Sequence, residues 1–424
     1  MLVPGSADVV LVLEGTWPHA IGGVSTWVDG LVRGLPDVRF GVVHLYAGDA
    51  PGAARLAVPE NVVWRRDLGL PDALDAIDPA ALARLVPEAG LVHALSTGFA
   101  GLVAAEVKRQ RGVPFVLTEH GVYWHEIEQG APELETGLRV LGADVSGGNP
   151  CASRQGWVER FKAYARQAYA AADLITTVTE ANRPLQAALG VTDALVIPNG
   201  VSRPPTLPPP PSASEFALLH PSALEDASFR VGFVGRVTPL KDLHAWIRGF
   251  AGLLASEPGA RGYLVGPADD PGYAASCAAL ADRLGVADRV HQVGVQPVPV
   301  WLRLLDAAVL TSRSEAEPLA LLEAMAHGVP VVAPDVGGVR ALVVGGEAPP
   351  AGWVLDPALL DSDLPAALAR LAASPGLRQS LGRAGRRRTA GRSLEAVAAR
   401  YREAYASLGA GPGATVPDCD PGQA

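Results

Sequence analysis

The stretch from Ala307 to Ala333, AAVLTSRSEAEPLALLEAMAHGVPVVA, contains an apolar run, a polar turn, a helical pattern and a second apolar run. The two apolar runs, Ala307–Thr311 and Pro330–Ala333, have the length and the valine content of buried strands. Two strands that are joined through a helix pair in parallel. The stretch therefore predicts a parallel sheet that is covered by helices.

The same alternation continues through both halves of the chain. Helical stretches such as Trp157–Ala172 and Tyr273–Leu284 separate the apolar runs, a pattern typical of parallel sheets that are buried on both faces. The other predicted strands are Val9–Leu13, Val42–Tyr46, Leu91–Ala94, Pro114–Thr118, Leu174–Thr177 and Leu195–Ile197, followed by Arg230–Val234, Ala260–Val265 and Val290–Val293.

A proline-rich segment, residues 203–214, lies between the two series of strands. Proline runs stiffen toward polyproline II, and the position of this one favours a linker over a signalling ligand. We therefore predict an α/β protein with two doubly wound Rossmann-like domains, residues 1–202 and 215–392, facing across a cleft. A helix at 393–408 is expected to pack back on the first domain, ahead of a disordered tail at 409–424.

Composition narrows the class of protein. The chain has 424 residues, is 49% hydrophobic and carries a net charge of −9, which is typical of a globular enzyme and disfavours broad nucleic-acid binding. It has three cysteines without a zinc-ligand spacing and no apolar run of membrane-spanning length. We expect a cytoplasmic protein that can dock peripherally on a membrane assembly. The weakly periodic segment 121–157 is expected to be functional or mobile.

Two glycines, Gly22 and Gly23, follow the first strand and precede a helical pattern. Paired glycines let a ligand approach the backbone, and a helix start offers N–H groups to a diphosphate. A plain turn is the competing interpretation. The sequence Asn199-Gly200 is interpreted as a structural turn.

The segment Gly235–Asp242 leaves a strand and carries Arg236 and Lys241, whose charges suit a leaving diphosphate, although a solvated basic loop has the same composition. His120 ends another strand, where it can bond a sugar hydroxyl or make a local structural contact. A metal site with His125 is not favoured, because the spacing of metal-binding helices is missing.

Two carboxylates, Glu315 and Glu323, flank the turn that follows Ala307–Thr311. A carboxylate binds vicinal hydroxyls well, since each oxygen accepts a hydrogen bond, and both ribose and hexose are diols. The competing interpretation is an exposed helix face with a capping acid.

Taken together, Gly22-Gly23-Val24, Gly235-Arg236…Lys241 and Glu315-x7-Glu323-Ala324-Met325 resemble the retaining family 4 glycosyltransferases of GT-B fold. The N-terminal motifs Leu13–Val28 and Leu117–Tyr123 are similar to the branch that contains the Pel-exopolysaccharide glycosyltransferase. The resemblance implies hexose transfer from a nucleotide-diphosphate sugar, UDP-glucose or a relative, to a glycan or lipid-linked acceptor in polysaccharide or cell-envelope synthesis. It implies no metal and no cofactor beyond this UDP-sugar co-substrate, and it allows docking to a membrane polysaccharide-export complex.

The resemblance also implies the roles of individual residues. Arg236 and Lys241 would bind the diphosphate, Glu323 the ribose, Glu315 the donor sugar, and His120 would act at the catalytic centre. The implied donor-binding set is Gly22, Gly23, Gly235, Arg236, Lys241, Val293, Gly294, Glu315, Pro318, Leu319 and Glu323, and the implied catalytic set is His120, Glu315, Arg236 and Lys241.

One departure from the family pattern concerns the donor sugar. Ala316-Glu317 stands where the family has glycine and an uncharged residue, so an extra acid beside the sugar is expected to alter the choice of donor. Two further functions remain open: a catalytically silent GT-B subunit of a polysaccharide-assembly complex, and a GT-B phosphorylase or epimerase. Product formation from a labelled UDP-sugar separates them.

Overall fold

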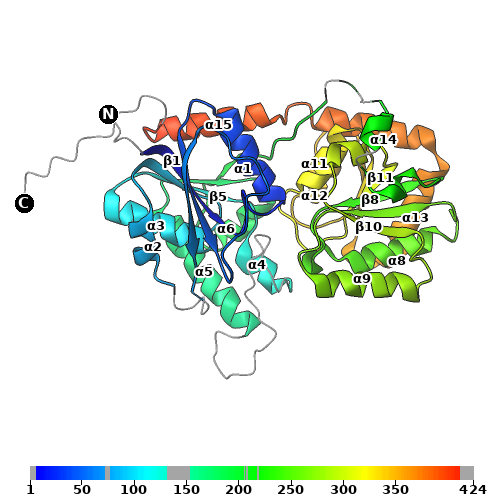
Figure 1. Ribbon diagram of the computed structural model, residues 1–424, viewed down its shortest axis with the longest axis horizontal. Helices are drawn as coiled ribbons and strands as arrows, with labels where there is room; N and C mark the ends of the chain where they lie inside the picture. Colours follow the sequence, from blue (N-terminus) through cyan, green and yellow to red (C-terminus); the bar gives the residue numbers. More distant parts are fainter. Residues whose placement is uncertain are drawn as a thin grey trace, which may run out of the picture. The chain divides into compact units, whose positions relative to one another are not determined.

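The computed structural model describes residues 6–71, 77–130, 153–204, 206, 209–216 and 219–410. The chain divides into two compact units (Figure 1), one formed by Met1–Pro198 with Leu394–Ala424 and the other by Asn199–Ser393. Most of the segment predicted to be functional or mobile, residues 131–152, lies outside the described residues. The same is true of the predicted disordered tail from residue 411 onward.

Unit 1 contains a seven-stranded parallel sheet in the order β3-β2-β1-β4-β5-β6-β7. Its strands are β1 (Ala7–Glu14), β2 (Phe40–Tyr46), β3 (Val62–Gly69), β4 (Ala89–Ala94), β5 (Phe115–Glu119), β6 (Leu174–Thr177) and β7 (Leu195–Val196). Its helices are α1 (Gly23–Gly34), α2 (Pro79–Leu85), α3 (Phe99–Arg111), α4 (Tyr123–Glu128), α5 (Arg154–Ala171), α6 (Arg183–Ala187) and α15 (Leu394–Ser407).

Both faces of this sheet are buried, which explains why its central strands are continuously apolar. Val10 and Val12 of β1 belong to a core cluster that includes residues of α3 and α5. Val9 and Leu11 point the other way, into a cluster that includes residues of α1 and α15. Alternate residues of a strand face opposite sides of the sheet, so a strand between two helical layers needs apolar residues at every position.

Helix α15 returns to unit 1 and packs beside α1 (Figure 1). A Cβ atom at Gly34 of α1 would lie only 2.5 Å from the Cβ of Ala398, so the glycine allows the two helices to approach closely. Two tyrosines of α15 bond to the sheet beneath: the Tyr405 hydroxyl lies 2.8 Å from His93 Nδ1, and the Tyr401 hydroxyl lies 3.1 Å from Thr118 Oγ1.

Unit 2 contains a six-stranded parallel sheet in the order β10-β9-β8-β11-β12-β13. Its strands are β8 (Arg230–Val234), β9 (Arg261–Val265), β10 (Val290–Gly294), β11 (Ala307–Val309), β12 (Val331–Pro334) and β13 (Gly352–Leu355). Its helices are α7 (Ala213–Phe216), α8 (Leu243–Leu253), α9 (Pro271–Arg283), α10 (Val298–Leu302), α11 (Leu319–Ala326), α12 (Val339–Val343), α13 (Leu360–Ala373) and α14 (Pro375–Arg388).

Each predicted strand has a counterpart in these sheets, and the two that the sequence did not predict lie at sheet edges. Strand β3 is half exposed and carries the charged run Arg65-Arg66-Asp67, whereas β13 has only four residues. Charged residues protect an edge strand against pairing with other chains, and they remove from β3 the apolar signal of a central strand.

The second unit begins earlier than predicted. Asn199 is already part of it, and described residues of the proline-rich segment contact it directly. Arg386 donates a hydrogen bond to the Pro204 carbonyl at 2.9 Å, and Arg303 donates one to the Pro209 carbonyl at 3.3 Å. These contacts attach the segment to unit 2, so it is not a free linker.

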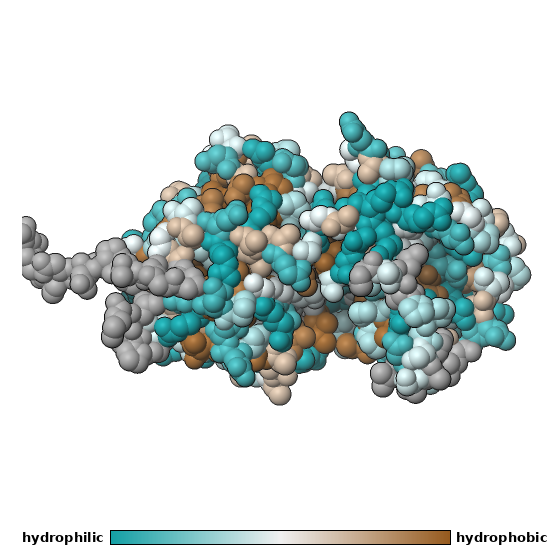
Figure 2. All heavy atoms as spheres, turned by 90° about the horizontal axis from the view of Figure 1, so that it is seen from above, coloured by the Kyte–Doolittle hydropathy of each residue, from teal (hydrophilic) through white to brown (hydrophobic). Residues whose placement is uncertain are grey.

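Hydrophilic and hydrophobic residues are interspersed on the face that Figure 2 shows. None of the helices in the described ranges combines the length and the hydropathy that a membrane crossing requires.

We predict that Gly34→Ala destabilises unit 1. In most helices this change is stabilising by about 0.5–1 kcal/mol, but here the new methyl group meets Ala398, and overpacking typically costs about 1–3 kcal/mol. The midpoint of urea unfolding should fall, and Ala398→Gly in the same chain should restore it. The matched control is Gly376→Ala in α14, because no atom lies within 4 Å of the added Cβ there. An equal response of the two single variants would contradict the close packing of α1 and α15.

Candidate functional site

The reversal of strand order in unit 2 marks the expected position of a ligand. Strand β8 lies between β9 and β11, so the connections leaving β8 and β11 run in opposite directions across the sheet. In open α/β sheets, ligands bind beyond the carboxyl ends of the strands at this point. The two loops that leave it are 235–242, after β8, and 310–318, after β11.

Hydrogen bonds hold these two loops together. Thr311 Oγ1 donates to the carbonyls of Lys241 and Asp242, at 3.0 Å each. The Arg313 N–H donates to the Leu240 carbonyl at 2.9 Å. The loop after β8 ends in a single 3-10 turn, Pro239–Lys241, and Asp242 then caps helix α8. The backbone that carries Lys241 is therefore fixed from both sides.

Lys241 and Glu315 form an ion pair across these loops. Lys241 Nζ lies 2.7 Å from Glu315 Oε1, and Ser312 Oγ donates to the same oxygen at 2.6 Å. The side chains are only 14% and 6% exposed. Electrostatic attraction is stronger at a site shielded from water. The sequence assigned these two residues to different parts of a ligand, and the structure brings them into direct contact.

Arg236 is held by a different acid. Its Nε donates to Asp269 Oδ2 at 2.9 Å, and its side chain is 13% exposed. Asp269 follows β9, where the sequence analysis identified no site residue. The backbone beneath Arg236 is closely packed, since a Cβ at Gly266 would lie 2.0 Å from the Gly235 carbonyl oxygen. The Gly266 N–H donates to the Gly294 carbonyl at 2.8 Å, so this packing also includes one of the predicted donor-binding residues.

The glycine turn after β12 supports Glu315. The Gly338 N–H donates to the Ala316 carbonyl at 2.8 Å. Gly337 has a φ of +50°, and a Cβ there would lie 1.5 Å from the Glu315 carbonyl oxygen. Only glycine fits this position, both because of the left-handed conformation and because of the lack of space.

Glu317, the extra acid expected beside the donor sugar, is bonded to other residues of unit 2. Its Oε2 accepts a hydrogen bond from the Asn199 N–H at 2.7 Å, and its Oε1 pairs with Arg392. Its backbone carbonyl accepts another from Asn199 Nδ2 at 3.0 Å. Asn199 and Arg392 lie next to the two points where the chain passes between the units, so Glu317 joins the loop after β11 to both ends of unit 2. Burial raises the pKa of Glu317, and Arg392 and Asn199 oppose that shift.

Glu323 lies on α11, the helix that follows this loop. Burial raises the pKa of its carboxyl group to about 7, even though its surface is partly exposed. Within the described ranges, its carboxyl group has no hydrogen-bond or ion-pair partner. Pro318 precedes the helix and Leu319 is its first residue, with no side chain capping the free N–H groups. A polar ligand at this helix end would provide partners that the protein itself does not.

Two of the predicted residues, Val293 and Gly294, form the end of β10. Val293 is buried, and Gly294 has a φ of +69°. Its carbonyl accepts a hydrogen bond from the Gly266 N–H. The end of β10 is thus joined to the residue that follows β9, which packs against Gly235 next to Arg236.

In unit 1, Gly22 and Gly23 form the start of α1. Gly22 is the N-cap residue, Gly23 is the first helical residue, and no side chain caps the helix. His120 follows β5 and contacts this helix through Trp27, whose ring lies edge-on to the imidazole at a centroid distance of 4.6 Å. Burial lowers the pKa of His120 to about 3, so the ring is neutral near pH 7. Its Nε2 is buried without a hydrogen-bond partner among the described residues.

Two buried acids end β1 and β5, the strands on either side of β4 in unit 1. Glu14 accepts hydrogen bonds from Ser96 Oγ at 2.7 Å and from the Ala100 N–H at 2.5 Å, which caps helix α3. Glu119 accepts hydrogen bonds from three side chains, Tyr169, Gln186 and Thr97. Burial raises the pKa of both carboxyl groups. These acids hold the ends of β1 and β5, from which Gly22 and His120 follow.

Two family models match the chain. One is described as a domain of unknown function (DUF3492) and matches residues 7–79 and 72–194. The other is described as glycosyl transferases group 1 and matches residues 219–388, which include all the loops of the site in unit 2.

Curated relatives agree with the second match. A D-inositol 3-phosphate glycosyltransferase of Segniliparus rotundus is 36% identical over 187 residues, which cover 41% of this chain and 40% of that protein. Another, of Thermobispora bispora, is 28% identical over 418 residues, which cover 91% of this chain and 89% of that protein. The chain spans less than half the length of the first curated relatives it matches.

Solved structures agree on the fold. The Anabaena protein HepE, solved in complex with UDP-glucose, superimposes with a TM-score of 0.71 at 19% identity, covering 94% of this chain and 99% of that chain. The two parallel Rossmann-like units therefore have the fold of GT-B glycosyltransferases, and residues 219–388 of the second unit are similar to the glycosyl transferases group 1.

Proposed function

We propose that the chain is a retaining, metal-independent hexosyltransferase that uses a nucleotide-diphosphate sugar, UDP-glucose or a relative. Its acceptor would be a glycan or a lipid-linked glycan in polysaccharide or cell-envelope synthesis. The main support is the group formed by Lys241, Glu315 and Ser312 at the strand reversal of unit 2. The UDP-glucose complex of HepE and the glycosyltransferase names of the curated relatives agree with this proposal.

In this mechanism the cations of unit 2 stabilise the leaving diphosphate. Lys241 would exchange part of its interaction with Glu315 for a phosphate oxygen, and Arg236 would remain oriented by Asp269. The released Glu315 oxygens would then accept hydrogen bonds from hydroxyl groups of the donor sugar. The charged groups would thus change partners while their positions stay nearly the same, so little reorganisation is needed when the bond between the sugar and the diphosphate breaks.

The other proposed contacts follow from unmet hydrogen-bonding capacity. Glu323 would bind the ribose hydroxyls, and the N–H groups at Leu319 would bind phosphate. In unit 1, His120 would bond a sugar hydroxyl through its buried Nε2 as a neutral ring. The uncapped start of α1 at Gly22 and Gly23 would bind an anionic group. The acceptor hydroxyl would attack the anomeric carbon from the face that the diphosphate leaves, as the bond to the phosphate oxygen breaks, and its proton would pass to the departing β-phosphate. No protein nucleophile is then needed.

The reaction is tested by incubating the protein with ¹³C-labelled UDP-glucose and candidate glycan acceptors. We expect a new glycoside with the anomeric configuration of the donor, measured by NMR, and release of UDP. Thermal shifts with UDP, GDP and ADP sugars should identify one preferred nucleotide. A thermal shift with a nucleotide, but no product and no nucleotide release under any condition, would support a catalytically silent subunit instead. A free epimer would support an epimerase, and a requirement for phosphate would support a phosphorylase.

Lys241→Met is expected to lower kcat by about 100-fold or more, because charge stabilisation in the transition state is lost. The double variant Lys241→Met/Glu315→Gln should also be inactive, and it avoids leaving the buried Glu315 charge unpaired. The matched control is Lys108→Met, which removes another ion-paired lysine, 2.6 Å from Asp173, and should keep full activity. Wild-type turnover in Lys241→Met would refute the role of its charge.

Donor affinity should depend on the ionisation of Glu323. Hydroxyl groups bond best to the ionised carboxylate, whose pKa is about 7 in the free protein. Affinity for UDP measured by calorimetry should therefore rise about tenfold between about pH 6 and about pH 8. Glu323→Gln should bind more weakly and lose this pH dependence. A wild-type affinity that does not change over this range would argue against contact between Glu323 and the nucleotide.

Glu317→Gln is expected to affect stability and not donor choice. The change removes the ion pair with Arg392, which is partly exposed, so we expect a loss of about 1–3 kcal/mol in unfolding free energy. A double-mutant cycle with Arg392→Met should show coupling between the two residues. The ratio of rates with UDP-glucose and other UDP-sugars should not change. A changed ratio at unchanged stability would mean that Glu317 contacts the sugar after all.

A further inference from the structure

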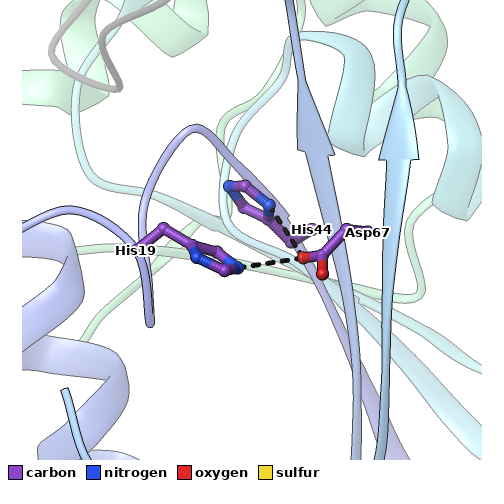
Figure 3. Close-up of side chains that lie close together, drawn as sticks. All are labelled: His19, His44 and Asp67. Carbon is purple, nitrogen blue, oxygen red and sulfur yellow. Dashed lines mark hydrogen bonds and ion pairs between the residues drawn. The ribbon is translucent and has the colours of Figure 1, made fainter. Parts of the chain in front are cut away.

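Two histidines and an aspartate converge at the edge of the unit 1 sheet (Figure 3). His19 Nε2 lies 3.1 Å from Asp67 Oδ1, and His44 Nδ1 lies 3.2 Å from the same oxygen. One ligand atom from each residue lies within 4.8 Å of the other two. We propose that His19, His44 and Asp67 form a binding site for a divalent transition-metal ion of the Zn²⁺ type.

The backbone builds this cluster from three separate segments. His44 on β2 and Asp67 on β3 are direct partners in the parallel register, so their side chains leave the same face of the sheet. His19 comes from the loop after β1. Its N–H donates to the Thr16 carbonyl at 3.0 Å, and the Pro18 carbonyl accepts hydrogen bonds from the backbone of residues 55 and 56. The three ligands are therefore positioned before any ion binds.

The distances fit a small cation. Ligand atoms about 2.0–2.1 Å from Zn²⁺ at tetrahedral angles lie about 3.3 Å apart, close to the two measured separations. Both imidazoles point at the same carboxylate oxygen, Asp67 Oδ1, and neither points at Oδ2 (Figure 3). A metal ion would occupy the space between ligand atoms that all lie within 4.8 Å of one another.

The chemistry of the ligands selects the type of ion. Two imidazoles and one carboxylate suit Zn²⁺ and its neighbours, whereas Mg²⁺ and Ca²⁺ prefer oxygen ligands throughout. The Asp67 side chain is 28% exposed and that of His44 only 2%, so solvent reaches one side of the cluster and can supply the remaining ligand. Among the described residues, His19 Nδ1 and His44 Nε2 have no hydrogen-bond partner. Without an ion, Asp67 Oδ1 is the partner of both inner nitrogens, His19 Nε2 and His44 Nδ1. Each inner nitrogen would present its lone pair to the ion once the ring carries its proton on the outer nitrogen.

One neighbour opposes binding. Arg65 Nε lies 3.6 Å from Asp67 Oδ2, and its charge would repel the ion. If the histidines only form hydrogen bonds with Asp67, no ion is present for Arg65 to repel. Removing the Arg65 charge therefore distinguishes a metal site from a cluster held by hydrogen bonds alone.

No sequence pattern indicates this cluster. Its members lie 48 and 23 residues apart, and none of the short spacings that mark zinc-binding helices or knuckles connects them. The metal site proposed here therefore differs from the expectation that the chain binds no metal. The proposed ion would fix the loop that leads to Gly22 and Gly23, and it is independent of the proposed transferase reaction.

The experiment uses the full, tag-free chain after dialysis against a chelator. Calorimetry with ZnCl₂ should show binding of one equivalent, and Co²⁺ should give visible d–d absorption. Zn²⁺ should also raise the melting temperature, because it binds only the folded state. Asp67→Asn, which keeps the size of the side chain, should weaken binding about tenfold or more, and so should His44→Gln. Circular dichroism establishes that each variant is folded.

Two further variants separate a built site from adventitious binding. Arg65→Gln should tighten Zn²⁺ binding about threefold or more, because the repelling charge is gone. His125→Gln is the matched control. It removes a histidine that also lies beside a carboxylate, 3.6 Å from Glu128, and binding should not change. Equal Zn²⁺ affinity in the wild type and in folded Asp67→Asn, or no binding by the wild type, would overturn the proposal.

Discussion

The ion pair between Lys241 and Glu315 is the interaction on which the site in unit 2 depends. It places a cation and an anion 2.7 Å apart with little exposure to water. Such a pair gains little net stability, because removing both charges from water costs about as much as their attraction returns. In the proposed function, the pair serves instead to hold Lys241 ready for a ligand. A diphosphate would replace Glu315 as the partner of Lys241.

Most of the surrounding structure serves to keep this pair in place. Thr311 bonds to the Lys241 backbone, Ser312 bonds to the Glu315 carboxylate, and Gly337 allows the turn after β12 to lie against the Glu315 carbonyl. Glu317 then links the same loop to both ends of the unit. The loop after β11 is thus held at successive positions by groups from distant parts of the sequence, which is the kind of support that a precisely positioned charge requires.

The sequence predicted the central strands and the loops at their carboxyl ends because the signals of both are local. A strand that is buried on both faces must be apolar throughout, and a loop at its carboxyl end lies at the ligand side of the sheet. Strand β3 gave no such signal because it is an edge strand with charged residues. The sequence also suggested that Glu317 faces the donor. It does not reveal that Asn199 and Arg392 are near, since both are more than 70 residues away along the chain.

The most direct test of the central claim is a crystal structure of the protein with UDP bound. We expect Lys241 Nζ and the Arg236 guanidinium to lie within hydrogen-bonding distance of diphosphate oxygens. Lys241 should then lie farther from Glu315 Oε1 than the 2.7 Å that separates them without a ligand. A nucleotide bound elsewhere, with the Lys241–Glu315 pair unchanged and Arg236 bonded only to Asp269, would contradict it.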